Sequence, residues 1–362
     1  MALTGFKVEN SDMRKLRIAI LSPIHWRTPP HKQGAWELVA SNITEELVRR
    51  GHDVTLFATA DSITKAKLRW VVPSPLLEPA GSVFESKLYS YMHSAMTFEA
   101  AAEFDIIHNH FDGYPLTFSK LVKTPVVTTV HGFSSPQIKD LYMRYNQSYY
   151  VSISQADRRH CPEMNWIANI HHGIDFEDLP FSATYDDYFV FLGRVHPTKG
   201  THLAIQAAKK ANVKLRIAAH IDKNDPLVRT YWEQECLPYI DDEQVVFVGE
   251  VGPKGKSELL RGAVATLCPI QWAEPFGLVF VESMASGTPV IAYGSGSAPE
   301  IIKNNVGGIV VKPNDMEAFV ESIKTVRELD RRLVREYAEK AFSIKHMVDQ
   351  YEQVYAQILD KI

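Results

Sequence analysis

Residues 16–58, LRIAILSPIHWRTPPHKQGAWELVASNITEELVRRGHDVTLFA, decide the fold because they encode a strand, a helix and a second strand in succession. Residues 16–22 form a short apolar run, which predicts a buried strand. Residues 35–50 repeat apolar side chains at helical spacing, and Gly51 is the residue type that ends a helix in a left-handed conformation. Residues 53–58 predict the next strand. The stretch therefore indicates one β–α–β unit of a buried parallel sheet.

The same pattern continues along the chain and then restarts. Further short apolar runs at 104–108, 126–130 and 150–153 predict strands of the first sheet. Residues 173–187 are acidic and turn-rich, as expected of an interdomain linker. A second series follows, with strands expected at 188–192, 215–219, 245–248, 265–268 and 289–292 and helices near 201–211, 226–240 and 255–262. We therefore predict the α/β class, with two Rossmann-like doubly wound domains facing each other across a cleft.

The length of 362 residues fits this division, because domains average about 150 residues. We expect residues 1–15 to be a flexible leader, 16–178 to form the N-terminal domain and 179–344 to form the C-terminal domain. Two helical stretches are expected near 315–328 and 330–360. The helix at about 345–362 is expected to pack back on the N-terminal domain.

The composition excludes several classes of function. Asp and Glu (43) slightly outnumber Lys and Arg (39), and the net charge of −4 argues against nucleic acid as a partner. No apolar run reaches the ~18 residues of a transmembrane segment, and residues 1–13 lack the apolar region of a signal peptide. Three widely spaced cysteines indicate free thiols, so we expect a cytoplasmic protein. The sequence has no CxxC pair and no Cys/His cluster with zinc spacing, so the composition predicts no zinc site.

The most informative stretch for chemistry is residues 273–290, AEPFGLVFVESMASGTPV, directly after a predicted strand. Pro275 suits the first turn of a helix, and Gly277 allows a ligand to approach the backbone. The N–H groups of Phe276, Gly277 and Leu278 would then form an anion site at the helix N-terminus.

Two carboxylates flank this helix start. Glu274 is expected just outside the helix and Glu282 about two turns inside it, near the same face. In isolation such a pair is better explained by a helix-entry carboxylate and a solvated surface charge. The flanking sequence favours ligand binding instead.

A second cluster of polar residues, LGRVHPTKG at 192–200, follows the first strand of the second series. Arg194 offers a planar fork that matches phosphate oxygens, and Lys199 adds a compact positive charge. Both are expected at the carboxyl end of the strand, where they would face the cleft. Two cations within six residues suit a diphosphate, although two surface charges on a turn would give the same pattern.

The combination of these motifs is informative. A Gly-Arg-x4-Lys-Gly turn is followed about eighty residues later by Glu-Pro-Phe-Gly-x4-Glu, with Gly-Thr-Pro-Val-Ile after it. Val130-His131-Gly132, Gly173-Ile174-Asp175 and the Gly-Ser-Ala-Pro-Glu run that ends at Glu300 belong to the same pattern. Over essentially its whole length, the chain resembles the family 4 retaining glycosyltransferases of the GT-B fold.

The resemblance implies roles for the matching residues. Arg194 and Lys199 would neutralise the diphosphate of a sugar nucleotide, and Glu282 would hold the ribose hydroxyls. Glu274 would bind hydroxyls of the transferred hexose, with the 276–278 amides helping to position it. His131 would reach the hexose near its reacting face, so the implied catalytic set is Glu274, His131, Arg194 and Lys199.

Two positions depart from the family pattern. Gly34 matches one glycine of the N-terminal Gly-Gly loop, where backbone amides approach the phosphates, but Gln33 replaces the usual first glycine. His172 stands where the family often has Asn before Gly173. The sequence alone gives neither departure a role.

The acceptor side is expected on the N-terminal domain, with His25, Trp26 and His110 lining its pocket. His108 and His110 have the spacing of metal ligands on a strand, but apart from Asp112 no nearby carboxylate set completes a site. The helix expected at about 84–104 carries one lysine against three glutamates, which disfavours an anionic lipid surface. We therefore expect a small soluble acceptor.

The expected function is retaining, metal-independent transfer of a hexose from a nucleoside-diphosphate sugar, of UDP-glucose or GDP-mannose type, to a hydroxyl acceptor, with no cofactor. A sugar-nucleotide epimerase of the same fold and a catalytically silent sugar-nucleotide-binding protein are the alternatives. The complete Glu-x7-Glu block favours transfer over epimerisation, and the presence of both Glu274 and Lys199 argues against a silent binding protein. A Rossmann dehydrogenase is disfavoured because no Gly-x-Gly-x-x-Gly follows the first strand.

Overall fold

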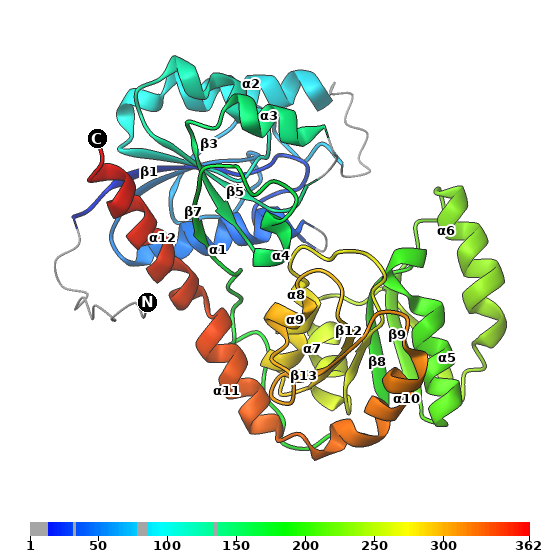
Figure 1. Ribbon diagram of the computed structural model, residues 1–362. Helices are drawn as coiled ribbons and strands as arrows, with labels where there is room; N and C mark the ends of the chain where they lie inside the picture. Colours follow the sequence, from blue (N-terminus) through cyan, green and yellow to red (C-terminus); the bar gives the residue numbers. More distant parts are fainter. Residues whose placement is uncertain (1–13, 32–33, 78–85, 134–136) are drawn as a thin grey trace.

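The computed structural model describes residues 14–31, 34–77, 86–133 and 137–362 (Figure 1). All but the last two residues of the expected leader lie outside this part. Within the described residues the strands form two parallel sheets, in the orders β3-β2-β1-β4-β5-β6-β7 and β10-β9-β8-β11-β12-β13. Both sheets therefore have the doubly wound order, and the predicted fold class is confirmed.

The strands of the first sheet lie between residues 17 and 169, and those of the second between 189 and 311. The first sheet contains β1 (Arg17–Leu21), β2 (Asp53–Phe57), β3 (Lys67–Arg69), β4 (Ile106–Asn109), β5 (Val126–Val130), β6 (Tyr149–Ser152) and β7 (Trp166–Asn169). The second contains β8 (Phe189–Arg194), β9 (Leu215–His220), β10 (Val245–Gly249), β11 (Thr266–Cys268), β12 (Val290–Tyr293) and β13 (Gly308–Val311).

The α-helices cover both faces of each sheet. Those on the first sheet are α1 (Ala35–Arg49), α2 (Ser86–Glu99), α3 (Ile138–Arg144), α4 (Gln155–Arg158) and α12 (Ile344–Leu359). Those of the second domain are α5 (Thr201–Ala211), α6 (Pro226–Tyr231), α7 (Pro253–Gly262), α8 (Leu278–Ala285), α9 (Ala298–Ile301), α10 (Met316–Thr325) and α11 (Arg331–Phe342). The predicted helix at 226–240 is shorter than expected, because α6 gives way to a π-turn at Trp232–Cys236.

The end of α1 shows how the first β–α–β unit closes. Gly51 has φ +89°, its N–H donates to the carbonyl of Val48, and the N–H of His52 donates to the carbonyl of Leu47. This is the Schellman arrangement expected of a glycine after a helix. It turns the chain directly into β2.

Helices α1 and α12 cover one face of the first sheet, and α2 covers the other. The apolar residues of α1, such as Ile43 and Leu47, share a buried core with Ile18 of β1 and with Tyr351 and Tyr355 of α12. On the opposite face Phe98 of α2 packs into a separate core. The last helix of the chain is therefore part of the N-terminal domain core.

The chain returns to the N-terminal domain through a break at Ser343, beside the expected domain boundary at 344. Residues 330–360 were expected to form one helical stretch, but Ser343 is extended (φ −73°, ψ 148°) and its hydroxyl accepts the N–H of His346 at the start of α12. Before the break α11 packs on α8 of the C-terminal domain, and after it α12 packs on α1 (Figure 1). The break lets consecutive helices belong to different domains.

Candidate active site

A cavity of about 980 Å³ lies between the two domains and is lined by residues of both. Its walls come from loops that follow β1 and β5 in one sheet and β8 and β11 in the other. In both sheets the strand order reverses at the first strand of the domain, and doubly wound folds bind ligands at that point. Ligand pockets of proteins commonly measure about 300–1,000 Å³, so this one has room for a large ligand.

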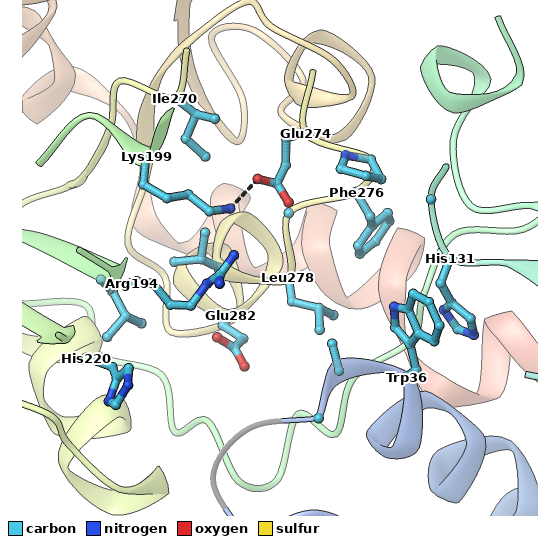
Figure 2. Close-up of a pocket in the computed structure, with 18 of the residues that line it drawn as sticks. Trp36, His131, Arg194, Lys199, His220, Ile270, Glu274, Phe276, Leu278 and Glu282 are labelled. Atoms are coloured by element: carbon cyan, nitrogen blue, oxygen red, sulfur yellow. Dashed lines mark hydrogen bonds and ion pairs between the residues drawn. The ribbon is translucent and has the colours of Figure 1, made fainter. Parts of the chain in front are cut away.

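The basic loop after β8 supplies two of the predicted residues (Figure 2). Arg194 ends β8 and is exposed, and its guanidinium has no hydrogen bond or ion pair within the described residues. Lys199 ends a 3₁₀ turn (Pro197–Lys199), and Gly200 follows with φ +74°. A Cβ at Gly200 would lie 2.2 Å from the carbonyl oxygen of Pro269, so glycine is needed for the close approach of the two loops.

Lys199 forms an ion pair with Glu274, where the loop after β8 meets the loop after β11. The Nζ of Lys199 lies 2.5 Å from Oε2 of Glu274, and the indole N–H of Trp272 donates to the same oxygen at 2.9 Å. The ammonium also lies 5.2 Å from the centre of the Trp272 ring. The structure thus brings the two sequence motifs together, with their charges paired.

The helix after Glu274 begins later than the sequence analysis predicted. Gly277 has φ +81° and is the N-cap, so α8 starts at Leu278 and Pro275 lies outside the helix. The Glu282 carboxylate is accordingly about one turn inside the helix instead of two. Phe276, Gly277 and Leu278 all line the cavity at the start of α8, as the anion-site prediction requires.

Glu282 is paired with a lysine that sequence reasoning missed. The Nζ of Lys256 on α7 lies 2.5 Å from Oε1 of Glu282, and both side chains line the cavity. Lys254 and Lys256 stand on the same short helix, and nothing in the local sequence distinguishes the one that faces the cleft. Only the packing of α7 beside α8 makes the distinction.

His131 faces the cavity from the N-terminal domain, directly after β5. Its ring stacks on Trp36, with centroids 5.2 Å apart and planes 17° from parallel. Its Nε2 shares a hydrogen bond with Nδ1 of His110 at 3.0 Å, and its Nδ1 lies 3.4 Å from Nε2 of His172. Burial, and then the neighbouring His172 and His108, hold the pKa of His131 well below its usual range. The imidazole is therefore uncharged at neutral pH.

The structure corrects the prediction for His110 and places His172. His110 is fully buried behind His131 and does not line the cavity, contrary to the expected position. Its position follows from β4, where buried side chains continue to the end of the strand. His172 lines the cavity and packs edge-on against Phe276, with centroids 4.8 Å apart. Neighbouring His108 uses both ring nitrogens on the hydroxyls of Tyr355 and Thr129.

The remaining predicted residues, His25, Trp26 and Gly34, all line the cavity. Gln33 lies outside the described residues. The backbone N–H of Trp26 donates to the buried carboxylate of Glu37 at 3.2 Å. Burial raises the pKa of Glu37 to about 7, although its own backbone N–H and that of Trp26 oppose the shift. Glu37 is a second cleft residue that the sequence analysis did not single out.

Two further findings concern the part of the chain that the structure describes. It contains no group of three or more His, Cys, Asp and Glu side chains arranged to hold a metal ion. None of its helices is both long and apolar enough to cross a bilayer.

Two Rossmann-like domains that share a cleft define a GT-B type of protein, and solved structures agree. Sucrose-phosphate synthase from Thermosynechococcus elongatus superposes with a TM-score of 0.76 at 18% identity, covering 96% of this chain and 100% of that one. Alr3699/HepE from Anabaena, solved in complex with UDP-glucose, superposes with a TM-score of 0.70 at 18% identity, covering 96% and 100%.

The sequence comparisons identify the family. Residues 178–342 match the family described as "Glycosyl transferases group 1", and residues 37–179 match "Glycosyltransferase Family 4". The D-inositol 3-phosphate glycosyltransferase of Mycolicibacterium smegmatis is 25% identical, over 95% of this chain and 91% of its own length. The phosphatidyl-myo-inositol mannosyltransferase of Mycobacterium tuberculosis is 24% identical, over 89% of both chains. The chain belongs to the group 1, family 4 glycosyltransferases, which confirms the predicted family.

Proposed function

We propose that the protein is a retaining hexosyltransferase that moves a hexose from a nucleoside-diphosphate sugar to a small hydroxyl acceptor. The observation that carries this proposal is the convergence of Arg194, Lys199, Glu274 and the start of α8 on one wall of the cavity, opposite His131 (Figure 2). Cations, helix N–H groups and sugar-binding carboxylates are the groups that a sugar diphosphate needs.

The donor is assigned to the C-terminal side of the cleft. Arg194, whose guanidinium is unpaired within the described residues, and Lys199 would bind the diphosphate together with the N–H groups of residues 276–278. Glu282 would hold the ribose and Glu274 the hexose. Gly34, across the cleft, would allow backbone approach to the phosphates. UDP is the first candidate nucleotide, because HepE is described as bound to UDP-glucose, and GDP is the second.

The chemistry follows from where charge develops. As the glycosidic bond breaks, negative charge grows on the departing diphosphate, and the cations and helix N-terminus would stabilise it there. In the same-face mechanism the leaving phosphate oxygen takes the acceptor proton, so no protein base is needed. This mechanism leaves Glu274 to bind hexose hydroxyls, with its Oε2 held by Lys199 and Trp272. The uncharged His131 would contact the hexose without transferring a proton.

The acceptor is assigned to the N-terminal side, near His25 and Trp26. A relative is named for D-inositol 3-phosphate, a small polar acceptor of the proposed kind. Another is named for phosphatidyl-myo-inositol, and the exposed Leu88, Tyr91 and Met92 on α2 favour that second candidate class, a lipid-linked acceptor. Co-sedimentation with anionic vesicles at ~0.15 M salt separates the two, because exposed charges are screened there and strong pelleting would indicate apolar insertion.

The test of transfer is release of free nucleotide. The protein is mixed with UDP-glucose or GDP-mannose and candidate acceptors, with and without EDTA, and the anomeric proton of the product is read by NMR. We expect acceptor-dependent release, an α-linked product and activity that persists in EDTA. Lys199→Ala is the inactive comparison, and Lys312→Ala is the matched control, because Lys312 is exposed and unpaired within the described residues. An inverted product, or an epimerised donor, would refute the proposal.

A further inference from the structure

A single carboxylate of the C-terminal domain collects hydrogen bonds from the N-terminal domain. Glu300, on α9, accepts the backbone N–H of Gln155 at 2.8 and 3.0 Å and that of Ala156 at 3.4 Å. It also accepts the side-chain amide of Asn169 at 3.3 Å and bonds Nε2 of His171 at 2.7 Å. Every one of these partners lies outside the domain that carries Glu300.

The contacts satisfy groups that the fold would otherwise leave without partners. Gln155 and Ala156 begin α4, where the first N–H groups of a helix have no intrahelical acceptor. Burial alone would raise the pKa of Glu300, but its hydrogen bond and charge interaction with His171 and the two backbone N–H groups outweigh burial and lower the pKa. Glu300 is thus held as a carboxylate, and bonds to a charged acceptor are about twice as strong as neutral ones.

The same contacts reach the cleft. His171 precedes His172, which lies between His131 of the N-terminal domain and Phe276 of the donor wall. Nearby, Gly132 approaches Pro275 so closely that a Cβ on Gly132 would lie 3.0 Å from Cγ of the proline. In Figure 1, α4 and α9 lie on the facing sides of the two domains. The Glu300 contacts therefore lie beside the surface where the two half-sites meet.

The arrangement of the proposed site makes domain orientation important. The donor groups Arg194, Lys199, Glu274 and Glu282 all belong to the C-terminal domain, whereas His131 and the acceptor side belong to the N-terminal domain. Nucleotide binding can use one domain alone. Transfer needs both domains in register, because a displacement of about 1 Å can cost about a hundredfold in rate.

We propose that Glu300 is a positioning residue for transfer, which fixes the N-terminal half-site against the donor wall by holding α4 and the 169–171 segment. This inference rests on the proposed function, since it assigns donor binding and transfer to the two sides of the cleft. Glu300 does not touch substrate. Its removal should loosen the domain arrangement and leave the donor groups intact.

The experiment compares Glu300→Gln and Glu300→Ala with the wild type and with Glu317→Gln, an exposed and unpaired glutamate on α10 within the described residues. Glutamine keeps one acceptor oxygen and about the same volume, so it guards against a folding failure of the alanine variant. Three quantities are measured: UDP and GDP affinity by calorimetry, kcat and KM for transfer, and interdomain distances. Spin labels at Leu121→Cys and Leu237→Cys report the distances, because both positions are exposed and the native Cys161, Cys236 and Cys268 are buried.

We expect both Glu300 variants to bind nucleotide within about twofold of wild type, to show a broader distance distribution, and to lose at least about tenfold in kcat, which corresponds to ~1.4 kcal/mol. Glu317→Gln should match wild type in all three. An unchanged distance distribution would overturn the inference, as would a kcat within twofold of wild type or a loss of nucleotide affinity as large as the loss of turnover. A wild-type protein that binds neither nucleotide would instead refute the proposed function, and the distance measurement would still test Glu300.

Discussion

Replacing Lys199 with alanine would remove a proposed donor cation and also leave Glu274 without its ion-pair partner. The two side chains are 19% and 12% exposed, and their charged atoms are 2.5 Å apart. Breaking a fully buried pair costs about 3–5 kcal/mol and an exposed pair contributes about 0.2–1 kcal/mol, so roughly 1–2 kcal/mol of unfolding free energy is expected here. Loss of charge stabilisation in the transition state costs more, about 2.7–4 kcal/mol, or 10²–10³ in kcat.

The two effects separate in a double-mutant cycle of Lys199→Ala and Glu274→Gln. Urea denaturation should show the double variant to be more stable than Lys199→Ala, because the glutamine removes the unpaired charge. Nucleotide-release assays should show no recovery of turnover in the double variant. Recovery to near wild-type turnover would mean that Lys199 only neutralises Glu274, and it would refute the assignment of the lysine to the diphosphate.

Three further outcomes follow from the described contacts. Glu274→Ala should lower kcat about a hundredfold, which corresponds to ~2.7 kcal/mol, whereas Glu282→Ala should mainly raise the KM for the donor. Small and equal effects in steady-state kinetics would mean that both residues are only surface charges. The raised pKa of Glu37 means that the folded chain keeps a proton that the unfolded chain has released, so stability should fall as pH rises from 4.5 to about 7, by roughly 3 kcal/mol. Urea denaturation at pH 5 and pH 8 should show that this difference is lost in Glu37→Gln, and an unchanged difference would contradict the assignment. Glu352 is buried between Arg50 and His52, so Glu352→Ala should destabilise the chain by about 3–5 kcal/mol in the same assay, and a loss below 1 kcal/mol would argue against that network.

The sequence predicted strongly patterned elements and missed those whose stability comes from their neighbours. Long apolar runs identified the central strands of both sheets, but three edge strands were not predicted. β3 and β7 are short and partly exposed and have no such run, whereas β13 was missed although its sequence, GIVV, is apolar. The apolar periodicity continues across 330–360 and gave no sign of the helix break at Ser343, although the expected domain boundary at 344 lies beside it. Periodicity shows which face of a helix is apolar and not which domain that face packs on.

The site residues that could be predicted from the sequence are those that stand in recognisable motifs. Lys199 and Glu274 carry motif signatures, and the cavity contains both. His110 was misplaced because the alternation of buried and cleft-facing side chains at the end of β4 depends on how far the strand continues. Lys256 was missed because a lysine on an amphipathic helix looks the same whether it faces water or a carboxylate. The ion pair between Lys256 of α7 and Glu282 of α8 exists only in the folded chain, so the sequence could not show it.

The return of α12 to the first domain has a consequence for biosynthesis. Tyr351 and Tyr355 fill the core beside β1 and bond to Thr129 and His108, so that core lacks its last layer until residues 344–359 have been made. Domains generally fold in order as a chain emerges from the ribosome. Here the N-terminal domain must wait for α12, with an apolar face of its sheet uncovered while the C-terminal domain is being translated. During that interval the exposed apolar face can bind chaperones. A fragment that ends after the second sheet, before α12, should therefore aggregate when expressed.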